Sequence, residues 1–123
     1  MDVERMHAHC AAKPGAWPDW PWEEHGHPVF KVGPGERGKI FAFLGGSGVG
    51  VKAARSREVA DEWLQRYPGS VSVMAYIGRS GWNDLSFDGR IPDDELLEAV
   101  DESYRLVVEG LPQKLRPDGW DAG

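Results

Sequence analysis

The chain has little cysteine, no long apolar run and a shortage of basic charge, and each shortage excludes a class of protein. It holds one cysteine among 123 residues, so no disulfide can form within it. No apolar run approaches the roughly 20 residues that span a bilayer, and the start of the sequence lacks the apolar core of a secretory signal. We therefore expect a cytoplasmic protein of one domain that does not enter a membrane.

The charge balance is acidic and unevenly spread. Lys and Arg number 14 against 20 Asp and Glu, which gives a formal net charge of −6. Because phosphate contacts dominate the affinity of nucleic-acid binders, this balance argues against a protein that coats DNA non-specifically. Residues 31–90 are the exception, with nine basic and six acidic side chains. A basic surface, if there is one, must come from this middle segment.

Apolar periodicity and turn residues predict three helices and five strands. The predicted helices cover residues 2–12, 56–67 and 92–110, and the predicted strands cover 29–32, 39–44, 49–52, 71–77 and 82–87. Strands joined by short connections pair antiparallel. The pattern thus predicts an α+β fold, a two-layer α/β sandwich of order α-β-β-β-α-β-β-α with a five-stranded antiparallel sheet. We expect one domain over residues 1–116 and a flexible tail over residues 117–123.

Half of the six tryptophans fall in a proline-rich segment before the first predicted strand. Trp17, Trp20 and Trp22 stand among prolines in residues 16–28, and proline opposes both a helix interior and a central strand. We predict an extended loop whose indoles lie on the domain. Together with Trp82 they predict either a surface for a small aromatic ligand or a protein partner, or closure of the core.

Six basic residues form the candidate phosphate-binding set. They come from three strands, the start of the second helix and the turn before the last strand: Lys31, Lys39, Lys52, Arg55, Arg57 and Arg79. If they share one edge of the sheet, they form a modest positive patch beside Trp82, whose indole could stack on a base. The alternative is solubilising charge scattered over the surface.

No arrangement of residues in the sequence indicates catalysis or a metal centre. The glycine-rich residues 45–50 lead into a strand and lack the Lys-Ser/Thr ending of a phosphate loop, so they predict a hairpin turn. His7 and His9 point to different sides of a helix, and Cys10 lies on its apolar face, where we expect a buried and unreactive thiol. Asp84 is interpreted as a turn or strand-edge residue. We expect a non-enzymatic protein without metal or cofactor.

Short segments spread along the chain resemble one protein family. They are residues 13–16, 21–22, 30–32 and 38–42 in the first half, and residues 51–52, 67–69, 82–83, 88–93, 103–107 and 111–115 in the second. In order and spacing these segments resemble the MmcQ/YjbR family over residues 2–116. The resemblance implies the element order given above, and the family label carries a suggestion of DNA binding. Members often have a His before the Trp that matches Trp82, and a Lys where Gln113 stands, and this chain lacks both.

Two hypotheses for the function follow. The first is a non-enzymatic DNA-binding protein of the MmcQ/YjbR type, which holds phosphates with the six basic residues and stacks Trp82 on a base. The second is a binding module for a small aromatic ligand or a protein partner, which uses Trp17, Trp20, Trp22 and Trp82. The missing His and Lys remove positive charge and weaken the first hypothesis.

Overall fold

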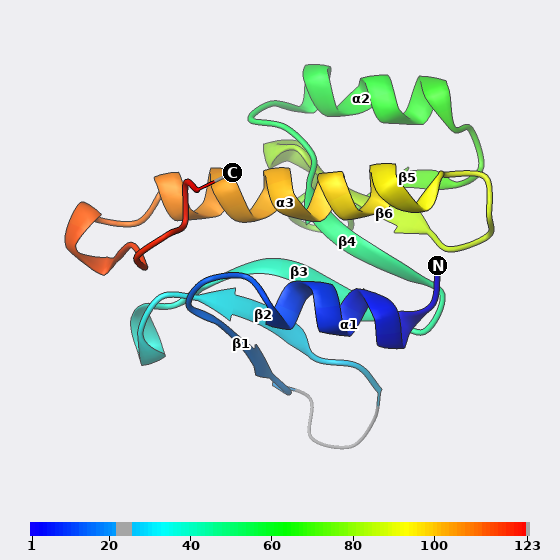
Figure 1. Ribbon diagram of the computed structural model, residues 1–123. Coiled ribbons are helices and arrows are strands. Elements are labelled where there is room, and N and C mark those ends of the chain that lie inside the picture. The colour runs from blue at the N-terminus through cyan, green and yellow to red at the C-terminus, as the bar shows by residue number, and fades with distance from the viewer. Residues whose placement is uncertain (22–25, 123) are drawn as a thin grey trace.

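The computed structural model describes residues 1–21 and 26–122 of the protein, and in them three helices lie over one sheet (Figure 1). The helices are α1 (Val3–Ala11), α2 (Arg57–Arg66) and α3 (Asp93–Glu109). The strands are β1 (Ala16–Asp19), β2 (Val29–Val32), β3 (Lys39–Gly45), β4 (Gly48–Lys52), β5 (Val71–Val73) and β6 (Trp82–Ser86). Short 3-10 turns cover Gly35–Arg37, Gly78–Ser80 and Gln113–Leu115.

The sheet has the strand order β1-β2-β3-β4-β6-β5, and every neighbouring pair is antiparallel. The predicted α+β class, with its helices and a single antiparallel sheet, is therefore confirmed. The predicted number of strands is wrong, because the described residues contain six strands rather than five. The extra strand changes the element order to α-β-β-β-β-α-β-β-α.

The missed strand is β1, in the segment predicted as a loop. Pro18 pairs with Phe30 in this strand, and Trp17 pairs with Lys31. β1 lies at the edge of the sheet, where one side of the strand needs no ladder bonds, so proline is tolerated there. A second difference concerns β5, which ends at Val73 rather than at residue 77. Tyr76 follows with a φ of 66°, and this left-handed conformation turns the chain out of the sheet.

All three helices cover the same face of the sheet. α1 buries Met6 and Cys10, and α3 buries Leu96, Val100 and Tyr104. The ring of Tyr104 meets Phe41 of β3 edge-on at 5.2 Å between centroids. α2 joins this layer through Asn83 of β6, whose buried amide donates to the carbonyl of Ala60 at 2.9 Å. The other face of the sheet carries no helix of the described chain (Figure 1).

A β-bulge in β3 decides which side chains reach each face. Phe30 pairs with Ala42 and Lys31 with Ile40, so Phe41 is an extra residue in β3. Phe41 and Ala42 are both fully buried under the helices. The bulge region is secured by Ser103 of α3. Its hydroxyl donates to the carbonyl of Phe41 at 2.6 Å and accepts from the amide of Lys52 at 2.9 Å.

Arg116 and Trp120, near the end of the described residues, lie against the domain. Trp120 is half-buried beside the core, and the guanidinium of Arg116 lies 5.5 Å from the centre of its ring. Arg116 also donates to the carbonyls of Glu109 and Leu111, which lie at and just beyond the end of α3. The flexibility expected of residues 117–123 stays a prediction about motion in solution.

Candidate functional site

A cavity of about 400 Å³ lies on the sheet face away from the helices. We call it the open-face groove. Strands β3, β4, β6 and β5 line it with small residues, chiefly Gly48, Gly50, Ser70, Ser72 and Ser86. Phe43 and Asp84 are the large side chains of this lining that are not buried in the core, whereas Leu44 and Leu85 border the groove with buried side chains. Short side chains on neighbouring strands therefore leave a hollow between an aromatic ring and a carboxylate.

The strand register explains how the groove forms. Phe43 pairs with Gly50, Gly50 with Asp84, and Asp84 with Ser72, so these four residues form one row across the sheet. Paired residues of antiparallel strands share a face. Their neighbours along the chain, such as Leu44 and Leu85, are buried on the helix side. The row thus belongs wholly to the uncovered face.

Two glycines of β4 shape the groove for different reasons. A Cβ on Gly48 would lie 2.5 Å from the backbone oxygen of Leu85, so close approach of β4 and β6 requires glycine there. A Cβ on Gly50 would lie 2.7 Å from the sulfur of Met74 and 3.1 Å from Oδ1 of Asp84. The space above Gly50 is therefore shared by the ends of two side chains that can move.

Asp84 is the charged residue of the groove lining. None of the ion pairs or hydrogen bonds found among the described residues involves its carboxylate. Asp84 is exposed, but neighbouring groups desolvate its carboxylate in part, and this raises its pKa above the ordinary value because desolvation disfavours the charged form. The sequence interpretation of Asp84 as a turn or strand-edge residue is wrong, since it lies within β6 between β4 and β5.

Trp82 stands beside the groove and packs against its aromatic wall. Its ring meets Phe43 edge-on, with centroids 5.6 Å apart and planes at 80°. Trp82 is half-buried, so part of the indole stays accessible. Trp82 pairs with Lys52, whose ammonium is directed away to the carbonyl of Ser80 at 2.7 Å.

Four of the six candidate basic residues gather at one end of the sheet. Lys52 ends β4, Arg55 follows it, Arg57 begins α2, and Arg79 lies in the 3-10 turn that contacts them. Burial, and then the charge of Arg55, lower the pKa of Lys52. Of these four, Lys52 pairs with Trp82 in the sheet and Arg57 donates to its carbonyl, so these two lie beside Trp82, while phosphate binding by the set stays a prediction.

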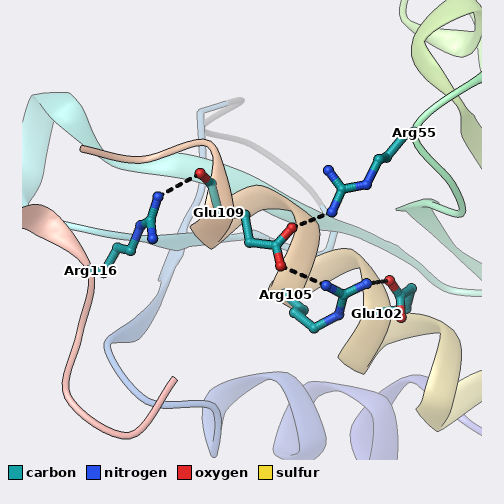
Figure 2. A network of polar contacts seen from close by, with 5 residues as sticks. All are labelled: Arg55, Glu102, Arg105, Glu109 and Arg116. Carbon is teal, nitrogen blue, oxygen red and sulfur yellow. Dashed lines mark hydrogen bonds and ion pairs between the residues drawn. The ribbon is translucent and has the colours of Figure 1, made fainter. Parts of the chain in front are cut away.

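Most of these basic side chains already form ion pairs or hydrogen bonds with carboxylates and carbonyls of the protein. Arg55 binds Glu109 at 2.5 Å, and Glu109 also accepts from Arg105 at 2.6 Å (Figure 2). Arg57 pairs with Asp61 at 2.7 Å and donates to the carbonyl of Gly78 at 2.8 Å. Arg57 is also bonded to the carbonyl of Trp82 and the side chain of Asn83. Arg57 thus holds α2 to β6, which is a structural role.

The other two basic candidates lie elsewhere. Lys31 of β2 pairs with Asp19 at 2.7 Å, and its ammonium lies 5.3 Å from the centre of the Trp17 ring. Lys39, at the start of β3, is exposed, as is Arg79. Neither of these two exposed cations forms an ion pair with another residue in the described ranges. The six residues therefore do not make one continuous patch.

The described tryptophans of the first segment, Trp17 and Trp20, do not gather with Trp82. Trp17 lies on edge strand β1, and its indole donates to the carbonyl of Gly33 at 2.8 Å. Trp20 is 51% exposed. Trp22 lies outside the described residues. β1 and β6 are separated by three strands, so Trp17 and Trp82 belong to different parts of the sheet.

The remaining candidate groups give no second site. Cys10 is fully buried, and burial raises the pKa of its thiol to about 12. In residues 1–21 and 26–122, no group of three or more His, Cys, Asp or Glu side chains could hold a metal ion. Among the same residues, no helix has the length and apolar character needed to cross a membrane.

The fold defines a two-layer α+β protein with one sheet face left open. Its sequence matches the model of the YjbR family over residues 11–106, so the chain belongs to the YjbR family. It is 27% identical over 119 residues to the uncharacterized protein YjbR of Escherichia coli K12, covering 94% of this chain and 95% of that protein. The YjbR protein of Escherichia coli O157:H7 matches to the same extent.

The fold also has a solved counterpart. The crystal structure of Deinococcus radiodurans protein DR2400, with the family-model domain DUF419, superposes with a TM-score of 0.83 at 23% identity. The match covers 99% of this chain and 94% of that one. The family resemblance found in the sequence is thereby confirmed, and so is an α+β fold with one antiparallel sheet, although the element order that the resemblance implies lacks β1.

Proposed function

We propose that this protein is a non-enzymatic, cytoplasmic binding protein that takes a small ligand with a planar aromatic part in the open-face groove. The observation that carries the proposal is the cavity of about 400 Å³ between Phe43 and Asp84. Ligand pockets in proteins measure roughly 300–1,000 Å³ and combine apolar surface with a few polar groups. The open-face groove meets both conditions.

The aromatic wall favours a flat ligand. Phe43 lines the groove, and Trp82 supports it edge-on at 5.6 Å. A ring laid over Gly50 would contact Phe43 once the flexible end of the Met74 side chain, which lies over Gly50, moves aside. Offset or edge-on contacts between aromatic rings add about 0.5–1.5 kcal/mol to the burial of their area.

DNA binding, the first hypothesis from the sequence, has less support. Arg55, Arg57 and Lys31 already pair with carboxylates, and the chain carries a net charge of −6. Lys39 and Arg79 stay exposed but lie on separate elements. A duplex titration at about 50 and 200 mM salt tests this hypothesis, because bound phosphates release counterions and make affinity fall steeply with salt. Absence of binding at the lower salt would dismiss DNA as a partner.

A nuclear magnetic resonance titration with indole tests the groove directly. We expect indole to shift the amide signals of Gly48, Gly50, Ser72 and Asp84. Phe43→Ala removes the aromatic wall and is expected to abolish these shifts. Trp20→Ala is the matched control, because Trp20 is 51% exposed and does not line the groove.

Two outcomes would contradict the proposal. One is a protein whose groove amides do not move at millimolar indole. The other is binding that survives in folded Phe43→Ala but is lost in Trp20→Ala, which would move the site to the first segment of the chain. A fingerprint spectrum of each variant shows whether it is folded.

A further inference from the structure

We infer that the ligand of the open-face groove carries a positively charged nitrogen that pairs with the carboxylate of Asp84. The inference rests on the proposed function and narrows the ligand class to aromatic amines and similar planar cations. It would make Asp84 the group that selects between ligands of equal size and opposite charge.

The position of Asp84 gives the first argument. Its row across the sheet places it between Gly50 and Ser72, within the groove lining. Oδ1 lies 3.1 Å from the point where a Cβ of Gly50 would stand, so the carboxylate leans over the glycine floor. A ring resting on that floor would bring an attached nitrogen to the carboxylate.

The surroundings of Asp84 give the second argument. Serines and glycines make up most of the nearby lining, and none of them carries charge. Two of the described cations near β6 are engaged elsewhere. Lys52 donates to the carbonyl of Ser80, and Arg57 pairs with Asp61. Within the described chain, the exposed carboxylate of Asp84 forms no ion pair and stays available to a ligand.

The serines can complete the recognition of a protonated amine. An ammonium group donates three hydrogen bonds and needs acceptors in addition to one carboxylate. Ser72 pairs with Asp84 across β5 and β6, and Ser86 lies two residues further along β6. Both serines line the groove, and a hydroxyl oxygen accepts readily.

The aromatic ring of Phe43 also favours a positively charged ligand. A cation close to an aromatic face is attracted by the ring quadrupole. Phe43 and Asp84 lie on opposite sides of Gly50 in the same row, about 10 Å apart at the backbone, so a ligand can set its ring against Phe43 and its charged nitrogen against Asp84. Partial desolvation of Asp84 raises its pKa, and a bound cation would relieve that desolvation cost.

Three probes with the same ring and different charge test the inference: indole, tryptamine and indole-3-acetate. We expect tryptamine to bind about tenfold more tightly than indole, the scale of one charge-assisted hydrogen bond, and indole-3-acetate to bind most weakly. In Asp84→Asn, tryptamine is expected to fall to the affinity of indole, while indole itself stays unchanged. The matched control is Asp19→Asn, because Asp19 pairs with Lys31 at the β1 edge, outside the groove.

The results test the inference about Asp84 and the proposed function separately. Equal or weaker binding of tryptamine than of indole overturns the inference and leaves the proposed function standing. The same holds if folded Asp84→Asn keeps the full preference for tryptamine, or if Asp19→Asn removes it. Failure of all three probes to shift the groove amides overturns the proposed function and the inference together.

Discussion

Ser103 offers the sharpest test of how the sheet and the helix layer are joined. Its hydroxyl is fully buried and makes two bonds to the backbone, one to the carbonyl of Phe41 and one from the amide of Lys52. These two groups belong to β3 and β4 beside the bulge. Ser103→Ala removes the hydroxyl that bonds to both backbone groups, and it leaves each of them without a partner in the dry core.

The expected magnitude follows from the number of groups affected. A buried polar group that loses its partner costs about 1–3 kcal/mol, and the alanine adds no clash. Because two groups lose their partner, we expect Ser103→Ala to lower the free energy of unfolding by about 2–6 kcal/mol. For a domain of this size, a change of about 3 kcal/mol lowers Tm by roughly 10 °C.

Urea unfolding followed by tryptophan fluorescence measures this change. The matched control is Ser72→Ala on β5, since Ser72 is exposed and we expect a change within about 0.5 kcal/mol. An unchanged slope of free energy against urea would show that both variants unfold from the same compact state. A loss below about 1 kcal/mol for Ser103→Ala would refute the reasoning, because water or a shift of the strands would then satisfy both groups.

Three further predictions concern the groove and the core. Gly48→Ala should lower the free energy of unfolding by about 2 kcal/mol, because its Cβ would meet the backbone oxygen of Leu85 at 2.5 Å. Gly50→Ala should lower it by less than about 1 kcal/mol, because its Cβ would meet the flexible ends of Met74 and Asp84. Urea unfolding compares the two variants, and a larger loss for Gly50→Ala would contradict the prediction. Asp84→Asn should stabilise the protein near pH 7 and have no such effect near pH 3. The pKa of Asp84 is raised in the folded state, so its ionised form is the destabilising one, and a calorimetric melt showing a loss near pH 7 would speak against this assignment. Cys10 should resist a thiol reagent in the native protein and react at once in urea, since burial raises the pKa of its thiol to about 12; rapid native labelling would disprove the burial of Cys10.

Local signals predicted most of the fold. α3 was predictable because Leu97, Val100 and Tyr104 recur at helical spacing and three acidic residues occupy its first turn, although the structure buries Leu96 more fully than Leu97. β1 was not predictable in the same way, because Pro18 argues against a strand unless the strand lies at an edge. That position is a property of the assembled sheet. The early end of β5 at Val73 likewise depends on Tyr76, whose positive φ could not be predicted from its residue type.

Only part of the candidate site could be predicted from the sequence. Trp82 was singled out because aromatic rings often mark binding surfaces, and it does stand beside the open-face groove. Asp84 was not, because its place between Gly50 and Ser72 depends on pairing between distant strands. One local signal could have found it. A strand that alternates buried Asn83 and Leu85 with a charged residue between them directs that charge to the uncovered face.

The extra residue in β3 also limits how this chain can vary. Phe41 lets two consecutive side chains enter the core, after which Phe43 emerges on the groove side. Without that residue the alternation would reverse over part of the strand, which would send an aromatic ring inward and an aliphatic one outward. Members of the family should therefore accept substitutions along this strand far more readily than a gap of one residue. The count of residues in a single strand, and not their chemistry alone, keeps the groove on its side of the sheet.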